Sequence, residues 1–207
     1  MTTAVKICGM TRVEDAVFAA RAGAHAIGMV LYSKSPRTVL SGRAREIVRA
    51  LPPFVTTVAL FVDPTAAEVE RALDEVNPQM LQFHGAEPPE FCAQFGLPFI
   101  KSVRVRAGLD LLQYARLYAE AKGLLLDAFV EGSHGGTGAS FDWELIPREL
   151  PLPVILAGGL TPANVTEAIR RVRPWAVDVS SGVEAAKGIK DAAKVAAFIR
   201  GARDADV

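Results

Sequence analysis

The chain has 207 residues, half of them hydrophobic, with 23 basic and 23 acidic side chains and no formal net charge. This length and composition fit one globular domain over residues 1–207 and exclude a disordered chain. Without net positive charge the protein lacks the field that holds nucleic acid or an anionic membrane, so we expect neither partner.

Short apolar runs rich in β-formers alternate along the chain with amphipathic stretches. The apolar runs predict strands at Val5–Ile7, Ala26–Leu31, Thr56–Val62, Met80–Phe83, Phe99–Val103, Leu124–Leu126, Val154–Leu156 and Ala176–Val179. The amphipathic stretches predict helices at Val13–Arg21, Gly42–Ala50, Ala66–Glu75, Pro88–Phe95, Leu109–Ala119, Asp142–Arg148, Pro162–Arg171 and Ile189–Arg200. Such alternation indicates parallel strands joined by crossover helices.

Eight such units favour a closed (β/α)8 TIM barrel over an open doubly wound sheet. The open sheet often carries a GxGxxG fingerprint after its first strand, whereas this chain has Cys8-Gly9-Met10-Thr11 there. Helix ends agree with the barrel map. Thr161-Pro162 predicts a helix start, and Gly23, Gly96 and Gly123 predict left-handed helix ends.

The two cysteines, Cys8 and Cys92, lie far apart, and neither belongs to a CxxC pair or to a zinc-type cluster. We therefore expect reduced thiols and no metal site. Reduced thiols, strand-sized apolar runs and an N-terminus without an apolar leader indicate a cytoplasmic protein.

The carboxyl ends of barrel strands carry the active site in this fold, so functional side chains are expected there. Side chains alternate along a strand, which places Lys6 and Cys8 inside the barrel when Val5 and Ile7 face the helices. By the same rule Asp178 points inward from the last strand, which neighbours the first. We expect Lys6 and Asp178 to form a buried ion pair.

Cys8 has two interpretations. A free cysteine is usually a small core residue, but a thiol beside a cation has a lowered pKa and is reactive. Cys92 has no such neighbour and lies on a predicted helix, where it is expected to be inert packing.

Two further polar residues end predicted strands. Asp127 follows Leu124–Leu126 and is either a loop cap or an acid whose pKa is raised by apolar walls, as suits a general acid. His84 shares parity with Gln82, so both are expected to face inward. His84 either lines the pocket or satisfies a structural hydrogen bond.

Three glycine-bearing segments follow the last three predicted strands, namely Gly135-Gly136-Thr137-Gly138, Gly158-Gly159-Leu160-Thr161 and Ser180-Ser181-Gly182. Each alone fits a tight turn. Barrels of this type commonly bind phosphate after strands seven and eight, and the helix start at Thr161-Pro162 adds a positive dipole end. The segments therefore predict a phosphate site.

The loop after the second predicted strand contains Ser35-Pro36-Arg37. Charged loop residues are usually only solvated. A guanidinium can nevertheless hold a carboxylate through two parallel hydrogen bonds, and Arg37 is placed to reach over the barrel mouth.

In their order along the chain, these segments together resemble the phosphoribosylanthranilate isomerase family. The segments are Lys6-Ile7-Cys8-Gly9, Ser35-Pro36-Arg37, Gln82-Phe83-His84-Gly85, Leu126-Asp127, Gly135-Gly136-Thr137-Gly138, Ala157-Gly158-Gly159-Leu160 and Asp178-Val179-Ser180-Ser181-Gly182-Val183-Glu184. The resemblance covers nearly the whole chain.

The resemblance implies an Amadori rearrangement of N-(5-phosphoribosyl)anthranilate, a sugar phosphate, without metal or organic cofactor. It implies that Asp127 is the general acid, Cys8 the general base and Arg37 the holder of the anthranilate carboxylate. The same resemblance implies that phosphate is held at Gly158, Gly159, Ser180, Ser181 and Gly182, with help from Gly138. By their inward parity, Lys6, His84 and Asp178 are expected to line the pocket.

Three alternatives remain open at this point. A dual-specificity isomerase would also act on a histidine-pathway aminoaldose, although such barrels generally use paired aspartates. A phosphate-binding barrel without catalysis is disfavoured by the presence of both Cys8 and Asp127. The domain also fits a partner of a neighbouring pathway enzyme, and the sequence does not decide between monomer and homodimer.

Overall fold

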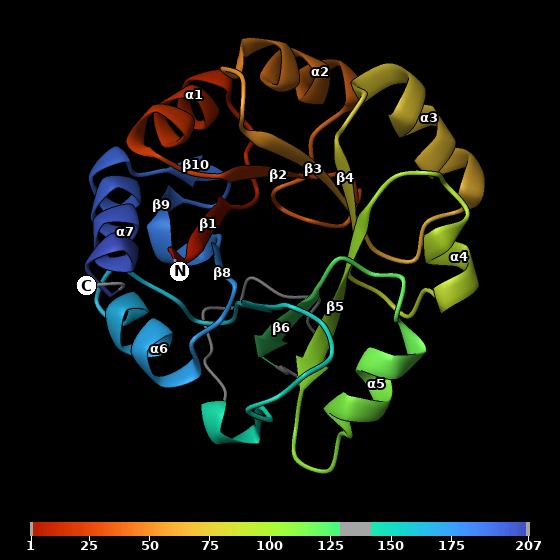
Figure 1. The fold of residues 1–207 in the computed structure, drawn as a ribbon. Coiled ribbons are helices and arrows are strands. Elements are labelled where there is room, and N and C mark those ends of the chain that lie inside the picture. Colours follow the sequence, from red (N-terminus) through yellow and green to blue (C-terminus); the bar gives the residue numbers. More distant parts are fainter. Residues whose placement is uncertain (1, 129–141, 206–207) are drawn as a thin grey trace.

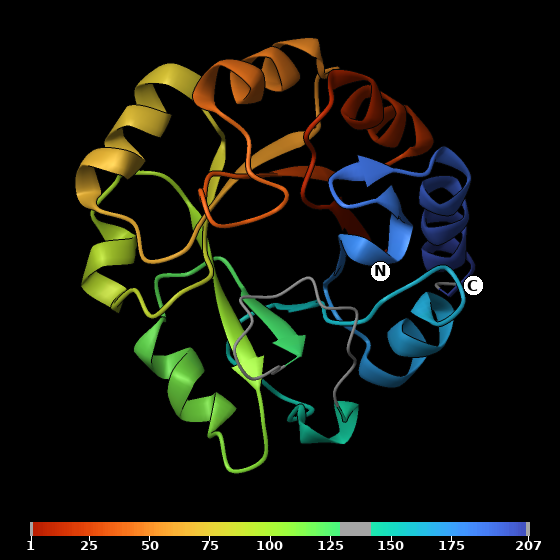
Figure 2. The same ribbon diagram turned by 180° about the vertical axis from the view of Figure 1, so that it is seen from behind.

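The computed structural model describes residues 2–128 and 142–205. Eight parallel strands pair in chain order and β8 pairs with β1, which closes the barrel predicted from the sequence. The strands are β1 (Ala4–Ile7), β2 (Ala26–Val30), β3 (Thr56–Phe61), β4 (Met80–Phe83), β5 (Phe99–Val105), β6 (Leu124–Ala128), β7 (Val154–Leu156) and β8 (Ala176–Val179). Figure 1 shows the helices as an outer ring, and Figure 2 shows the same ring from behind.

The described connections contain α-helices, two 3-10 turns and one hairpin. They are α1 (Val13–Ala22), α2 (Ser41–Ala50), α3 (Ala66–Val76), α4 (Pro89–Ala93), α5 (Leu111–Leu117), η1 (Trp143–Leu145), α6 (Val165–Val172), η2 (Ser181–Val183), β9 (Glu184–Ala186), β10 (Ile189–Lys190) and α7 (Ala192–Ala205). Local signals explain the ends: Thr65 and Glu68 form a capping box at the start of α3, and Gly23 ends α1 in the left-handed conformation.

Strand parity decides which side chains enter the barrel. On β6, Leu124 and Leu126 pack toward the helices, whereas Leu125 belongs to the cluster in the barrel interior. Ala176 on β8 belongs to the same interior cluster. The next inward positions are therefore Asp127 and Asp178, as parity predicted.

The extents of two predicted helices differ strongly from the structure, for local reasons. The stretch Asp142–Arg148 contains only the short turn η1, and Pro147 lacks the N–H that a helix would need there. The last helix begins at Ala192 instead of Ile189, because the Asp191 side chain accepts the Lys194 N–H at 3.0 Å and caps it. The residues before it form the unpredicted antiparallel hairpin of β9 and β10.

Two smaller expectations also fail. The helix predicted from Pro162 begins at Val165, since residues 162–164 form a turn in which Asn164 Oδ1 accepts the Thr161 N–H at 2.8 Å. Gly23 and Gly96 have positive φ as expected, but Gly123 does not. A Cβ at Gly123 would instead meet the Pro153 carbonyl oxygen at 2.9 Å, so close packing accounts for this glycine.

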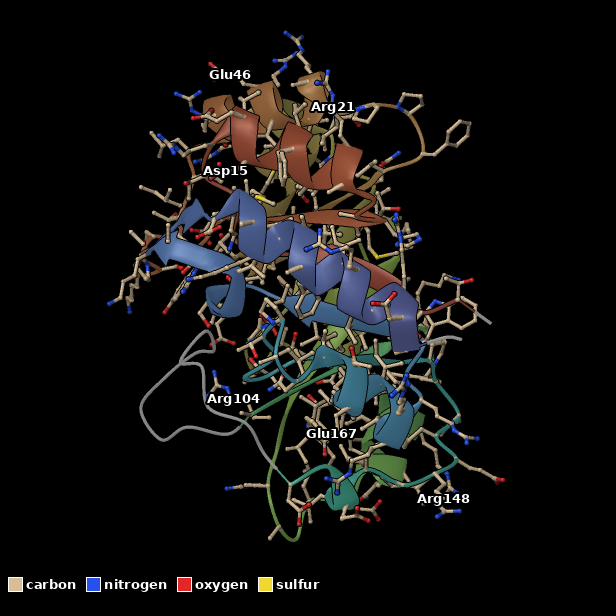
Figure 3. All side chains as sticks on the ribbon, turned by 90° about the vertical axis from the view of Figure 1, so that its left-hand side faces the viewer. Asp15, Arg21, Glu46, Arg104, Arg148 and Glu167 are labelled. Carbon is tan, nitrogen blue, oxygen red and sulfur yellow. The ribbon has the colours of Figure 1, made fainter. Side chains whose placement is uncertain are left out.

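The carboxyl ends of the strands open at one end of the barrel, which we call the mouth. In Figure 3, which views the barrel from the side, the β9–β10 hairpin projects from the same end at which Arg104 is labelled. Arg104 pairs in register with Asp127 across β5 and β6. Among the described residues, no helix is both long enough and apolar enough to cross a membrane.

Candidate active site

Lys6 and Asp178 form the predicted ion pair within the barrel. The two residues are paired in register across β1 and β8, and Lys6 Nζ donates to Asp178 Oδ1 at 2.8 Å. Both side chains are buried. A buried pair of this kind is tolerated because each charge has a hydrogen-bonded partner.

Cys8 follows β1 and packs at the mouth with Val30, Leu60 and Val62. The thiol is buried, and Gly28 on β2 leaves the space that it occupies. A Cβ at Gly28 would lie only 2.8 Å from Cys8 Sγ. Glycine is therefore required at this point of β2 for the thiol to lie where it does.

The pKa of the Cys8 thiol is raised in the folded protein, whereas the neighbouring Lys6 had suggested that it would be lowered. Burial raises this pKa, and the positive charge of Lys6, which acts to lower it, does not compensate. The negative charge of Asp178 also raises the pKa. The expected lowering by a nearby cation is wrong because burial and Asp178 oppose it, so the thiol is protonated at neutral pH.

Asp127 lies at the end of β6, buried at the mouth. Its Oδ1 accepts the Ala128 N–H at 2.8 Å, and its Oδ2 lies 3.3 Å from His84 Nε2. That second contact lacks hydrogen-bond geometry, so His84 Nε2 has no hydrogen-bond partner among the described residues. One carboxylate oxygen is thus fixed by backbone, and the other faces the imidazole.

His84 and Gln82 both face inward from the end of β4, as their parity predicted. Gln82 Nε2 lies 3.0 Å from His84 Nδ1 and 3.2 Å from the Ser102 hydroxyl oxygen. An amide nitrogen can only donate, so in this arrangement Nδ1 is the acceptor and the Nε2 edge of the ring faces Asp127. One side of the His84 ring therefore makes a structural hydrogen bond with Gln82, and the other side borders Asp127.

The glycines after β7 bring this loop against β6. Gly158 and Gly159 have φ of 78° and 66°, which glycine adopts readily. A Cβ at Gly158 would lie 2.5 Å from the Ala128 nitrogen and 3.0 Å from Asp127 Oδ1. The loop that is expected to hold phosphate therefore contacts Asp127 directly.

The loop after β8 packs on the loop after β7. A Cβ at Gly182 would collide with the Leu160 carbonyl oxygen, so only glycine permits this approach. Ser180 precedes the turn η2, which begins at Ser181. The structure thus brings the Gly158-Gly159 and Ser180-Ser181-Gly182 segments together, whereas the Gly135–Gly138 segment, including Gly138, lies outside the described residues.

Arg37 lies in the loop after β2, which folds back so that Thr38 bridges to Val30. Its guanidinium is buried and already holds a carboxylate, because Nε and Nη2 donate to the two oxygens of Glu184 at 2.7 and 2.8 Å. This pair of donors is therefore occupied by the protein's own carboxylate. The donors that remain are on the outer edge of the guanidinium, formed by Nη1 and the second Nη2 hydrogen.

Sequence reasoning missed two residues of this mouth, Glu184 and Lys190. Lys190 Nζ donates to Glu184 Oε1 at 3.0 Å and to the Ser180 carbonyl oxygen at 3.0 Å, and it is buried. Glu184 stands in the quoted motif, but its partner Arg37 is 147 residues away. The sequence carries no signal for this pair, because Arg37 becomes buried and needs an anionic partner only in the folded barrel.

Cys92 is placed as expected. It is buried on α4, outside the barrel, and burial raises the pKa of its thiol to about 12. Cys92 therefore stays protonated and provides a matched control for Cys8.

A family model described as N-(5'phosphoribosyl)anthranilate (PRA) isomerase matches residues 5–201. The N-(5'-phosphoribosyl)anthranilate isomerase of Nitrosospira multiformis is 61% identical over 201 residues, which are 97% of each chain.

Solved structures agree. Phosphoribosyl anthranilate isomerase from Thermotoga maritima superposes with a TM-score of 0.90 at 40% identity, over 98% of this chain and 100% of that one. A structure of phosphoribosyl anthranilate isomerase in complex with reduced 1-(o-carboxyphenylamino)-1-deoxyribulose 5-phosphate gives a TM-score of 0.87 at 39% identity, with the same coverage. The chain therefore belongs to the N-(5'-phosphoribosyl)anthranilate isomerase family.

Proposed function

We propose that this protein catalyses the Amadori rearrangement of N-(5-phosphoribosyl)anthranilate to 1-(2-carboxyphenylamino)-1-deoxyribulose 5-phosphate in tryptophan biosynthesis, with Asp127 as general acid and Cys8 as general base. One observation carries the assignment of roles. A buried carboxyl on β6 and a buried thiol after β1 border the same mouth, where the loops after β7 and β8 meet. Family membership supports the identity of the substrate.

The first step uses Asp127. Its carboxyl proton passes to the furanose ring oxygen as the bond from that oxygen to C1 breaks, and the nitrogen lone pair forms the C1=N iminium. His84 Nε2, at 3.3 Å from Asp127 Oδ2, faces the carboxylate that this step leaves behind. The imidazole edge turned toward that oxygen stabilises the developing negative charge electrostatically.

The second step uses Cys8. The thiolate removes the proton from C2, and the electrons of that C–H bond move toward the iminium to form an enolamine. The enol oxygen then loses its proton and C1 gains one, which gives the ketone. The positive iminium forms beside Cys8 and favours the thiolate, as an opposite charge does for any acid. Lys6 acts on the pKa of the thiol in the same direction.

The reaction uses a thiolate on Cys8 and a proton on the Asp127 carboxyl, so the active form carries one of the two protons that these two groups can hold. While the pair keeps one proton, the fraction in this arrangement does not change with pH. Above the pKa of Cys8 the pair loses that proton, and activity falls. Burial raises the pKa of Cys8, which moves this fall to higher pH.

The remaining groups are assigned to binding. The outer edge of Arg37, left unused by Glu184, holds the anthranilate carboxylate. The glycine loop at Gly158-Gly159 and the segment Ser180-Ser181-Gly182 hold the phosphate through backbone N–H groups. These two anionic ends place the sugar between Cys8 and Asp127.

The test is a fluorescence assay with the substrate formed in situ and no metal added, in which the fall of substrate fluorescence is followed and the product is identified by mass spectrometry. Wild type and Cys92→Ala are expected to form the product at similar rates. Cys8→Ala is expected to lose on the order of 10²- to 10⁴-fold in kcat.

Either of two results would overturn the proposal. A folded wild-type protein that forms no product rejects the reaction, and near-wild-type turnover by Cys8→Ala rejects the role of the thiol. Cys92→Ala separates these outcomes from a general effect of removing a buried sulfur.

A further inference from the structure

A buried chain of charged groups crosses the barrel mouth beside the catalytic thiol. It runs from Arg37 through Glu184 and Lys190 to Ser180, with each contact between 2.7 and 3.0 Å. Arg37 comes from the loop after β2 and Ser180 from the end of β8, so the chain joins the two places assigned above to the two anionic ends of the substrate.

Glu184 fixes the orientation of the guanidinium. A guanidinium is planar and has five N–H donors, and the Glu184 carboxylate takes one from Nε and one from Nη2. Two parallel hydrogen bonds prevent the plane from turning. The outer edge of Arg37 is therefore aimed in one direction before any ligand arrives.

Lys190 keeps the cluster positive. Burial alone would raise the pKa of Glu184, but the hydrogen bond from Arg37 and the charge of Lys190 outweigh it, and the net pKa is lower than usual. The carboxylate is thus ionised at neutral pH. One negative charge stands between two positive ones, so the cluster retains a net positive charge that attracts an anion.

Gly9 shows how closely the two ends of this chain approach. A Cβ at Gly9 would lie 2.6 Å from Arg37 Cδ and 2.8 Å from Ser180 Oγ, and the residue has a φ of 74°. Arg37 and Ser180 therefore both pack against the residue that follows Cys8. The two ends of the chain therefore meet next to the residue that carries the thiol.

Building on the proposed function, we infer that Glu184 and Lys190 are positioning residues: Glu184 acts through Arg37 on the aryl carboxylate of the substrate, and Lys190 acts through Ser180 on its phosphate. Neither residue touches substrate in this arrangement. Each holds its neighbouring binding group in one orientation before the ligand arrives. Less conformational entropy is then lost on binding, so affinity rises without a new contact to the ligand.

The main test is a double-mutant cycle on KM with wild type, Arg37→Ala, Glu184→Gln and the double variant. Glu184→Gln is expected to raise KM on the order of 10- to 100-fold, the usual effect of losing a hydrogen bond to a charged group. In the Arg37→Ala background, Glu184→Gln is expected to add nothing, because the group through which it acts is gone.

Controls separate positioning from damage to the fold. Glu46→Gln removes the carboxylate from the exposed Arg43–Glu46 pair and is expected to leave KM unchanged. Glu184→Asp keeps the charge and is expected to restore part of the lost affinity. If the rise in KM came only from misfolding, it would also appear in Glu184→Asp. Glu184→Gln would then raise KM both in the wild-type protein and in Arg37→Ala.

The role of Lys190 is tested with D-ribose 5-phosphate as a competitive inhibitor, because this compound carries the phosphate but no aryl carboxylate. Lys190→Met is expected to raise its inhibition constant on the order of tenfold, whereas Glu184→Gln leaves it unchanged. Losses that multiply in the cycle, or an unchanged KM in Glu184→Gln, would overturn the role of Glu184, and an unchanged constant in Lys190→Met would overturn that of Lys190. An inactive wild type would reject the proposed function itself.

Discussion

Gly28→Ala tests whether the position of the Cys8 thiol matters to the reaction. An added Cβ would lie 2.8 Å from Cys8 Sγ, 3.2 Å from Cys8 Cα and 3.2 Å from Lys6 Cε, whereas ordinary contacts begin at 3.4 Å. Sulfur would have to move by about 0.6 Å, the difference between 2.8 and 3.4 Å. The neighbouring Cα cannot rotate away, so the end of β1 must shift as well.

The expected cost follows from these distances. Overpacking of a core site usually costs about 1–3 kcal/mol of unfolding free energy. Displacing a catalytic group by about 1 Å can cost about 10²-fold in rate, so a smaller shift predicts a loss of kcat on the order of 10- to 100-fold. The two effects are separable, because a barrel that has lost this amount of stability remains folded.

Urea unfolding gives the stability and the fluorescence assay gives kcat. Gly42→Ala is the matched control, since a Cβ there meets nothing within 4 Å and the residue lies in α2. Alanine in place of a helical glycine should add about 0.5–1 kcal/mol and leave kcat unchanged. If Gly28→Ala were as active and as stable as wild type, the reasoning about the thiol's position would be refuted.

Two further predictions concern charge. In kcat/KM measured from pH 6 to 10.5, the fall at high pH is expected above about 8.5, the usual thiol value, because burial raises the pKa of Cys8; a fall centred below pH 8 would contradict this. Lys6→Met leaves Asp178 buried without its partner and should lower the unfolding free energy by about 3–5 kcal/mol, whereas Lys6→Met/Asp178→Leu should recover much of it. Urea unfolding that shows less than about 1 kcal/mol for the single variant would contradict the second prediction.

Much of the fold could be predicted from local patterns. Apolar runs located all eight barrel strands, and parity placed Lys6 and Asp178 on one face, because side-chain alternation is a local property of a strand. The hairpin before α7 was missed because an apolar residue followed by a basic one, as in Ile189-Lys190, fits the first turn of an amphipathic helix as well as a short strand. Only the Asp191 cap and the left-handed Gly188 mark the true boundary.

The candidate site also combines features that follow from local sequence with features that depend on the folded barrel. The positions of Cys8, Asp127 and His84 at the barrel mouth could be predicted because each lies at the carboxyl end of a strand. The partner of Arg37 could not be found, since the loop after β2 and the segment after β8 meet only in the folded barrel. The pKa of Cys8 was misjudged for the same reason: sequence shows a neighbouring lysine, whereas burial and the opposing Asp178 charge depend on the packed structure.

The central claim is that Asp127 and Cys8 serve one reaction in consecutive steps. The most direct measurement is kcat/KM for wild type, Cys8→Ala, Asp127→Asn and the double variant. Each single variant should lose on the order of 10²- to 10⁴-fold. Because the two residues act on different transition states and only the higher one limits the rate, the double variant should be no slower than the slower single variant. A single variant with near-wild-type activity, or losses that multiply in the double variant, would contradict the account.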